Sequence, residues 1–146
     1  MSYDIFFVSF VFVGHLCPDA AAKVGSTGRF SVVDVTPNQV EHAKSKLQQC
    51  PWATVRTGDA SEFSSILPDG ETPYDAVYAF MLLHEIPDKM KYQVVDNMLK
   101  SVKKGGTVLW YDNSHCCCLL QRCVLVILVL LNSTIIAKNV RLSGLT

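Results

Sequence analysis

The stretch YDAVYAFMLLHEIPDKMKYQVVDNMLKSVKKGGTVLWYD, residues 74–112, decides the fold class of this chain. Two apolar runs in it, at residues 76–80 and 107–111, have the length of buried strands. Between them, apolar residues recur at helical spacing, namely Val94, Val95, Met98, Leu99 and Val102. Asp88 can cap this helix, and Gly105-Gly106 can stop it. Strand, helix and strand in this order predict two parallel strands, and ligands bind at the carboxyl ends of such strands.

Three further apolar runs precede this stretch and also predict buried strands. They lie at residues 5–13, 30–35 and 53–57, and helix signals separate them. Strands that alternate with helices predict an α/β fold, in which helices cover both faces of a parallel sheet. We expect this domain to cover residues 1–112, and residues 113–146 to form a tail of different character.

The helix signals between these strands are local. Pro18 can stand in the first turn of a short helix at residues 19–24. The next helix has the stronger start, because Thr36 can cap it, Pro37 fits the first helical position and Gln39 stands three residues after the cap.

Length and charge narrow the class of protein. A chain of 146 residues suffices for one domain with a sizeable core. Its 13 basic residues balance its 13 acidic ones, and no basic patch favours a nucleic-acid partner.

Both ends of the chain are more apolar than its middle. Residues 5–13 are preceded by Asp4 and lack a small-residue cleavage site, so a strand is favoured over a signal peptide. Residues 123–137 are interrupted by polar side chains and are shorter than the roughly 20 residues that cross a bilayer as a helix. A small protein anchored in a membrane by this tail is the weaker alternative.

The cysteines favour neither a metal site nor a disulfide framework. No CxxC spacing occurs among the six, which are Cys17, Cys50, Cys116, Cys117, Cys118 and Cys123. We expect reduced thiols in an intracellular protein, with mitochondrial or membrane-associated locations left open.

Asp34 ends the second predicted strand. A carboxylate in this place can accept hydrogen bonds from both hydroxyl groups of a ribose. The alternative is that Asp34 only caps the following helix, but Thr36 already occupies the cap position.

The third predicted strand is followed by Gly58-Asp59-Ala60. Asp59 can accept a hydrogen bond from an adenine amino group while a neighbouring backbone N–H contacts the ring. A simple turn is the alternative, because Gly-Asp is common in loops.

His84 and Glu85 follow the fourth predicted strand. A histidine beside a carboxylate at a strand end can act as a general base, and it can also bind a divalent metal. A packed, hydrogen-bonded ring is the alternative. His15 is a second candidate near the same edge, whereas we expect His42 to be solvated.

Four segments together resemble successive motifs of class I S-adenosylmethionine-dependent methyltransferases. These are VVDVTPNQVEHAKSKL, TGDASEF, YDAVYAFMLLHEIPD and MLKSVKKGGTVLWYD, and the resemblance covers residues 13–112. It implies a Rossmann-like fold that is incomplete at both ends, and S-adenosylmethionine as cofactor. Asp34 would then bind the ribose, Asp59 and Ala60 the adenine, and residues 80–82, beginning with Phe80, would lie near the methionyl group.

More narrowly, residues 79–112 resemble the methyltransferase-like proteins of rhodoquinone biosynthesis. That branch implies a quinone-like acceptor, whose methoxy group becomes an amino group with S-adenosylmethionine as nitrogen donor and Mn²⁺ as helper. His84 and Glu85 would face the acceptor as catalytic residues, and the protein would associate peripherally with membranes.

The chain departs from the family pattern at both ends. The family has a glycine-rich turn after the first strand, and this chain has only Gly14 there, which we assign to cofactor binding. After Asp112, residues 123–131 and 134–141 can supply two strands, and a misread gene end is the alternative. These departures leave open a second interpretation, a truncated or decayed relative without activity.

Overall fold

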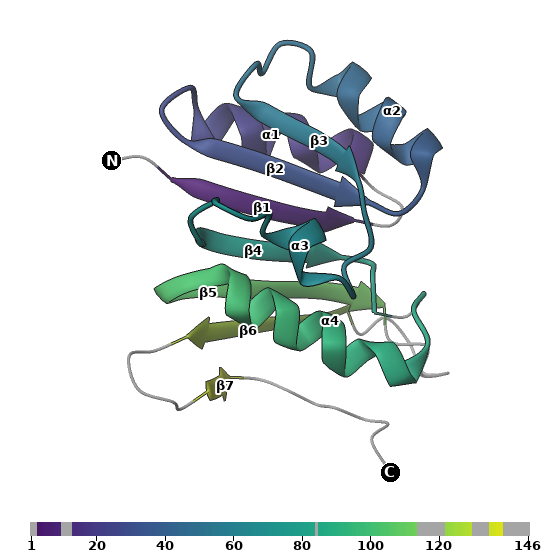
Figure 1. Ribbon diagram of the computed structural model, residues 1–146, viewed down its shortest axis with the longest axis vertical. Helices are drawn as coiled ribbons and strands as arrows, with labels where there is room; N and C mark the ends of the chain where they lie inside the picture. The colour runs from purple at the N-terminus through teal and green to yellow at the C-terminus, as the bar shows by residue number, and fades with distance from the viewer. Residues whose placement is uncertain (1–2, 10–12, 84, 114–121, 130–134, 139–146) are drawn as a thin grey trace.

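The computed structural model describes residues 3–9, 13–83, 85–113, 122–129 and 135–138 (Figure 1). Within them the elements follow one another as β1 (Asp4–Ser9), α1 (Val13–Val24), β2 (Arg29–Asp34), α2 (Pro37–Lys46), β3 (Ala53–Thr57), α3 (Phe63–Ile66), β4 (Tyr74–Phe80), α4 (Asp88–Ser101), β5 (Val102–Asn113), β6 (Arg122–Val129) and β7 (Ile135–Lys138). The predicted alternation of strands and helices is therefore confirmed as far as β5.

The strands form one sheet in the order β3-β2-β1-β4-β5-β6-β7. The pairs from β3 through β5 are parallel, whereas β6 pairs antiparallel with β5 and β7 antiparallel with β6. The chain passes from β1 outward to β3 and then returns to β4 on the other side of β1. This reversal creates a switch point at the carboxyl ends of the central strands, the place where open α/β sheets bind ligands.

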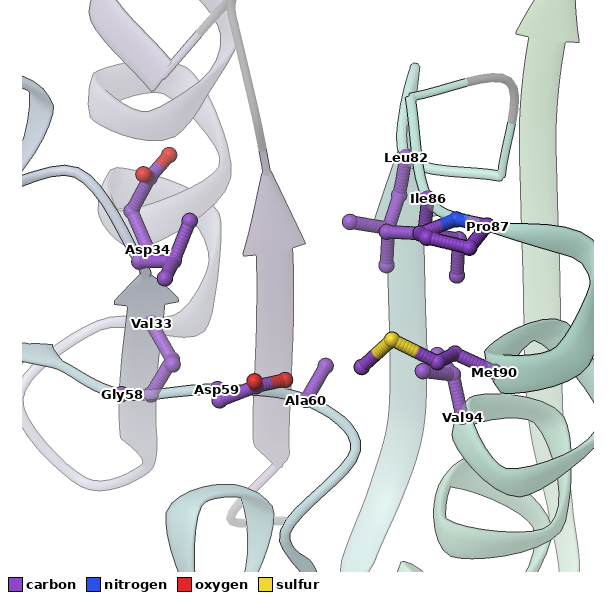
Figure 2. Close-up of a pocket in the computed structure, with 11 residues that line it drawn as sticks. Val33, Asp34, Gly58, Asp59, Ala60, Leu82, Ile86, Pro87, Met90 and Val94 are labelled. Carbon is purple, nitrogen blue, oxygen red and sulfur yellow. The ribbon is translucent and has the colours of Figure 1, made fainter.

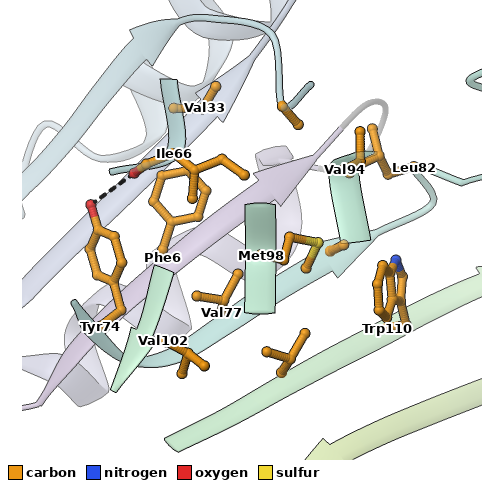
Figure 3. Close-up of a cluster of buried hydrophobic side chains, with 13 residues drawn as sticks. Phe6, Val33, Ile66, Tyr74, Val77, Leu82, Val94, Met98, Val102 and Trp110 are labelled. Atoms are coloured by element: carbon orange, nitrogen blue, oxygen red, sulfur yellow. Dashed lines mark hydrogen bonds between the residues drawn. The ribbon is translucent and has the colours of Figure 1, made fainter. Parts of the chain in front are cut away.

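Each face of the sheet carries its own apolar cluster. Phe6, Tyr74 and Met98 are fully buried in the cluster beneath α3 and α4 (Figure 3). Cys17 and Phe30 are fully buried in the cluster beneath α1 and α2. Each buried side chain of the size of Phe or Met contributes about 1.5–3 kcal/mol to folding. Helices thus cover both faces, and the predicted Rossmann-like α/β fold is confirmed (Figure 1).

The first strand and helix differ from the prediction. β1 ends at Ser9 rather than at residue 13, and α1 already begins at Val13. Gly14 therefore lies in the first turn of α1, and Pro18 lies inside this helix rather than in its first turn. The apolar run crosses from the strand into the helix without interruption, and such a run shows no period that could mark the change.

Both ends of α4 also differ from the prediction. Pro87 occupies the N-cap, and Asp88 lies in the first helical turn, where it pairs with Lys91 at 2.6 Å. α4 ends at Ser101, so Gly105 and Gly106 lie within β5 instead of terminating the helix. Both glycines are needed where the pairing of β4 with β5 is irregular. Gly105 has φ +81°, which favours glycine, and a Cβ on Gly106 would come within 2.7 Å of the Asp75 carbonyl oxygen.

The apolar tail contributes strands to the sheet. β6 and β7 correspond to the two strands that the sequence offered for this region, with somewhat shorter bounds. Among the helices of the described residues, none is both long enough and apolar enough to cross a membrane.

Candidate functional site

A pocket of about 160 Å³ lies beyond the carboxyl ends of β2, β3 and β4 (Figure 2). The residues that line it come from the ends of these strands and from the start of α4: Val33, Asp34, Val35, Gly58, Asp59, Ala60, Leu82, Ile86, Pro87, Met90 and Val94. Both carboxylates lie on one side of the cavity, together with Val33 and Ala60, and Leu82, Ile86 and Met90 lie on the opposite side (Figure 2). The predicted ribose and adenine residues therefore share one cavity.

Asp34 is the buried charged group of this pocket, with only 2% of its surface exposed. Its Oδ1 accepts a hydrogen bond from the backbone N–H of Thr36 at 2.7 Å. Its Oδ2 is buried and has no partner among the described residues. Burial raises the pKa of Asp34, and the hydrogen bond from the backbone N–H of Thr36 opposes this rise. An unpaired buried carboxylate oxygen is costly, so a ligand that donates a hydrogen bond there would be favoured.

Thr36 stands at the N-cap of α2, as predicted, but its side chain makes no capping hydrogen bond. Its carbonyl oxygen accepts the N–H groups of Gln39 at 3.0 Å and Val40 at 3.1 Å. The turn into α2 is thus closed by backbone groups and by Oδ1 of Asp34. Asp34 therefore supports the turn with one oxygen and leaves the other for a ligand.

The loop at residues 58–61 forms the floor of the pocket next to Asp34. The N–H of Gly58 donates to the carbonyl oxygen of Asp34 at 3.0 Å, which joins the loop to β2. Oδ1 of Asp59 accepts the N–H of Ser61 at 2.8 Å, so the simple-turn interpretation holds for this oxygen. The side chain of Asp59 nevertheless lies at the cavity beside Ala60 (Figure 2).

Asn97 on α4 supports this loop and was not predicted. It is 2% exposed, and its Nδ2 donates to the carbonyl oxygens of Ala60 at 3.0 Å and Ser61 at 2.8 Å. The sequence carried a signal for it, because Asn97 falls in the apolar stripe of the helix, three residues after Val94. A polar residue on a buried helix face needs hydrogen-bond partners.

The residues that the sequence placed near the methionyl group and the acceptor have different positions relative to the pocket. Of the wall expected at residues 80–82, Leu82 lines the pocket, whereas Phe80 stacks on Tyr78 with ring centroids 6.3 Å apart and packs toward the cluster beneath α1 and α2. Glu85 is exposed and is not part of the pocket lining. His84 lies outside the described residues. The catalytic roles of His84 and Glu85, and the cofactor role of Phe80, stay predictions.

Ile86, Pro87, Met90 and Val94 complete the apolar wall, and the sequence analysis missed all four as pocket residues. Pro87 caps α4, so the first two turns of this helix run along the cavity. Within α4, Met90 and Val94 have the spacing of any core-facing helix, so no sequence signal distinguishes them from ordinary core residues.

The remaining glycine and histidine predictions, and one residue with unusual backbone geometry, concern positions outside the pocket lining. Gly14 lies in the first turn of α1, after the carboxyl end of β1, and its assignment to cofactor binding stays a prediction. The side chain of His15 is outside the described part of the structure, whereas His42 is exposed on α2, as predicted. Met81, at the end of β4, has φ 53° and is the one described non-glycine residue with positive φ.

The manganese ion that the narrower resemblance implied stays a prediction, because His84 lies outside the described residues. Among the residues whose side chains the structure describes, no group of three or more His, Cys, Asp or Glu could hold a metal ion.

Comparisons with known proteins agree with this architecture. The family model described as a methyltransferase domain matches residues 13–106 of the chain. Among curated proteins, no sequence matches it significantly.

Several solved structures of methyltransferases have a similar fold. The N-methyltransferase NodS from Bradyrhizobium japonicum WM9, in complex with S-adenosyl-L-homocysteine, is similar with a TM-score of 0.61 and 18% identity, over 75% of this chain and 53% of that one. A SAM-dependent methyltransferase from Aquifex aeolicus has a TM-score of 0.63 and 16% identity, over 76% and 56%. The arsenic(III) S-adenosylmethionine methyltransferase of Chlamydomonas reinhardtii has 0.62 and 20%, over 76% and 38%. The chain thus spans little more than half the length of the first two, and these likenesses concern the fold.

Proposed function

The chain belongs to the methyltransferase domain family, and from this premise we propose that its pocket binds S-adenosylmethionine for methyl transfer to a small acceptor. The observation that carries the proposal is the carboxylate of Asp34, which is buried at the end of β2 with Oδ2 unpartnered among the described residues. A ribose offers two adjacent hydroxyl donors, which suit such a carboxylate. A hydrogen bond to a charged group contributes about 1.5–3 kcal/mol.

The residues around Asp34 fit the other parts of the same molecule. Asp59 and Ala60, one strand further along, offer a carboxylate and backbone groups to the adenine ring. Leu82, Ile86 and Met90 supply an apolar wall that keeps water away from the reacting atoms.

The bound cofactor would supply an electrophilic methyl carbon on a sulfonium sulfur, and it would leave as S-adenosylhomocysteine with the electron pair of the carbon–sulfur bond when a nucleophilic atom of the acceptor takes the methyl group. The residues of this chain contribute mainly by positioning. When both reactants are bound in line, the entropy cost of bringing them together is already met, and this accelerates the reaction. Asp34 fixes one end of the cofactor, and the start of α4 shapes the space beside it.

For the acceptor we propose a quinone-like small molecule. Support comes from the resemblance of residues 79–112 to the rhodoquinone branch and from the apolar wall, of which Ile86 and Pro87 would pack against a flat ring. Glu85 and His84 precede this wall in sequence and would face the acceptor. A quinone with an apolar tail is met at membranes, so a peripheral association of the protein belongs to the same proposal.

A second candidate is a cofactor-binding relative without transfer activity. The observation that favours it is the segment after β1, where the chain has Gly14 alone and this glycine lies in the helix. A loop with several glycines allows closer backbone approach to a ligand than a helical turn does.

Titration calorimetry with S-adenosylhomocysteine tests the proposal on the full chain. We expect micromolar binding to the wild type and none to Asp34→Ala, while Glu41→Ala, which removes an exposed carboxylate from α2, should bind like the wild type. Absence of binding to the wild type would overturn the proposal. Binding without turnover of labelled S-adenosylmethionine on any quinone would favour the second candidate, and mass spectrometry of the quinone separates methyl from amino transfer.

A further inference from the structure

We propose that Asn97 is a positioning residue for the cofactor: from behind the pocket, its buried amide holds the loop at residues 58–61 in the shape that recognises adenine. This inference rests on the proposed function, because it concerns the part of the same pocket that would receive the base. Asn97 does not itself line the pocket, so it acts through Asp59 and Ala60.

The contact between Asn97 and the loop uses the whole donor capacity of the side chain. An asparagine amide nitrogen has two hydrogens. Nδ2 of Asn97 donates to the carbonyl oxygens of Ala60 at 3.0 Å and of Ser61 at 2.8 Å. Two bonds to consecutive carbonyl groups fix both the position and the tilt of the peptide between them, which a single bond would not do.

The orientation of this amide is itself determined. Nε2 of Gln93, one helical turn earlier on α4, donates to Oδ1 of Asn97 at 2.9 Å. If the amide of Asn97 were rotated by half a turn, its oxygen would face two carbonyl oxygens and its NH₂ would face a donor. The two backbone carbonyl groups therefore determine the donating orientation of Asn97, and the hydrogen bond from Gln93 stabilises it.

The loop has other anchors, and they leave a specific task for Asn97. Gly58 donates to the carbonyl oxygen of Asp34, and Asp59 accepts the N–H of Ser61. These bonds fix the start of the loop against β2 and close its turn. Asn97 ties the second half to α4, which also carries Met90 and Val94 of the apolar wall. The width of the adenine space between loop and helix thus depends on Asn97.

The expected effect is selective for the base. Asp34 would hold the ribose from β2, which Asn97 does not contact, so this interaction should survive a change at Asn97. Hydrogen bonds weaken steeply when the donor and acceptor lose alignment. A displaced loop would therefore lose its hydrogen bond with the amino group of adenine. The interactions with the ribose and with the purine ring, which do not depend on that amino group, would remain.

The test compares S-adenosylhomocysteine with S-inosylhomocysteine, in which a carbonyl oxygen replaces the adenine amino group, by titration calorimetry on the full chain. The wild type should prefer the adenine compound. Asn97→Asp keeps the shape but removes both donors, and we expect it to weaken the adenine compound about tenfold, the loss of one good hydrogen bond, and the inosine compound less than about twofold. The preference for adenine should therefore largely disappear.

Two further variants protect the test against a simple loss of stability. Ser101→Ala removes another buried hydrogen bond of α4, from Oγ to the Met98 carbonyl oxygen, and should leave the preference unchanged. Gln93→Leu, at an exposed position, should reduce the preference about threefold even if Asn97→Asp does not fold.

An unchanged preference for adenine, or equal weakening of both compounds, in Asn97→Asp would overturn the role of Asn97, and the same result in Gln93→Leu would overturn it if Asn97→Asp does not fold. The proposed function would survive either result as long as the wild type binds S-adenosylhomocysteine. A wild type that binds neither compound would overturn the proposed function and this inference together.

Discussion

Oδ1 of Asp34 accepts the backbone N–H of Thr36 at 2.7 Å, and this bond fixes the carboxylate where β2 passes into α2. The second oxygen of the same group is left buried without a partner in the described part of the chain. The site is thereby preorganised at the expense of stability, because an ionised group is held away from water.

The first prediction concerns this cost in the ligand-free protein. Burial raises the pKa of Asp34 above its unfolded value, so the charged form destabilises the fold, and the penalty disappears as the pH falls through the raised pKa. Asp34→Asn should therefore be as stable as the wild type at neutral pH or about 1 kcal/mol more stable, and the difference should shrink toward acid pH. Urea unfolding at several pH values measures this difference. A variant that is clearly less stable at neutral pH would contradict the prediction.

The second prediction concerns the backbone of Met81. Its φ of 53° lies in the left-handed region, which costs a residue with a Cβ about 1–2 kcal/mol. Met81→Gly and Met81→Ala both remove the side chain, but only glycine removes this strain. Thermal or urea unfolding should find Met81→Gly more stable than Met81→Ala by about 1 kcal/mol. Equal stability, or a more stable alanine variant, would show that the strain does not exist.

The third prediction concerns Asp75, at the opposite end of the sheet from the pocket. Burial alone would raise its pKa, but the N–H of Asp4 at 2.7 Å and the ammonium group of Lys103 at 3.0 Å lower it overall. A lowered pKa stabilises the fold above the unfolded pKa of the group, and this stabilisation is lost as the pH falls through the folded pKa.

Asp75→Asn should therefore reduce the free energy of unfolding by about 1 kcal/mol at neutral pH, and the difference should begin to shrink at the ordinary pKa of an aspartate and close below the lowered pKa of the folded protein. The matched control is Asp69→Asn, which changes an exposed aspartate and should have no effect at any of these pH values. A difference that stays constant down to acid pH would contradict the electrostatic explanation.

The fourth prediction compares two cysteines. Cys17 is fully buried in α1, and burial raises the pKa of its thiol to about 12, whereas Cys50 is half-buried. Since the thiolate is the reactive form, iodoacetamide should alkylate Cys50 well before Cys17 in the folded protein. Peptide mass spectrometry follows both residues, and in denaturant the two should react alike. Faster reaction of Cys17 in the folded state would contradict its burial.

The sequence predicted much of the fold because the relevant signals were local. The boundaries of β3 were predicted as observed, and those of β2 and β4 to within two residues, because a buried strand flanked by turn residues is visible in its own composition. Asp34 and Asp59 could be placed together because parallel strands end at the same edge of the sheet.

The remainder depended on distant contacts, which no local pattern contains. Asn97 meets Ala60 across 37 residues of sequence, and only the packing of α4 shows that its amide serves the loop. Met90 has the pattern of a core residue but lies at the cavity. Gly105 was interpreted as a helix stop, yet the irregular pairing of β4 with β5 determines its place.

The position of β1 between β2 and β4 has a consequence for how the molecule assembles. Ile5 pairs with Phe30 on one side and with Ala76 on the other, so one edge of β1 stays open until β4 has been synthesised. At synthesis rates of about 5–20 residues per second, this edge is exposed for several seconds. Such nonlocal pairing slows folding and leaves an unpaired strand edge open to aggregation. The two sides of the pocket, Asp34 and Leu82, consequently meet only late in folding, when β4 closes against β1.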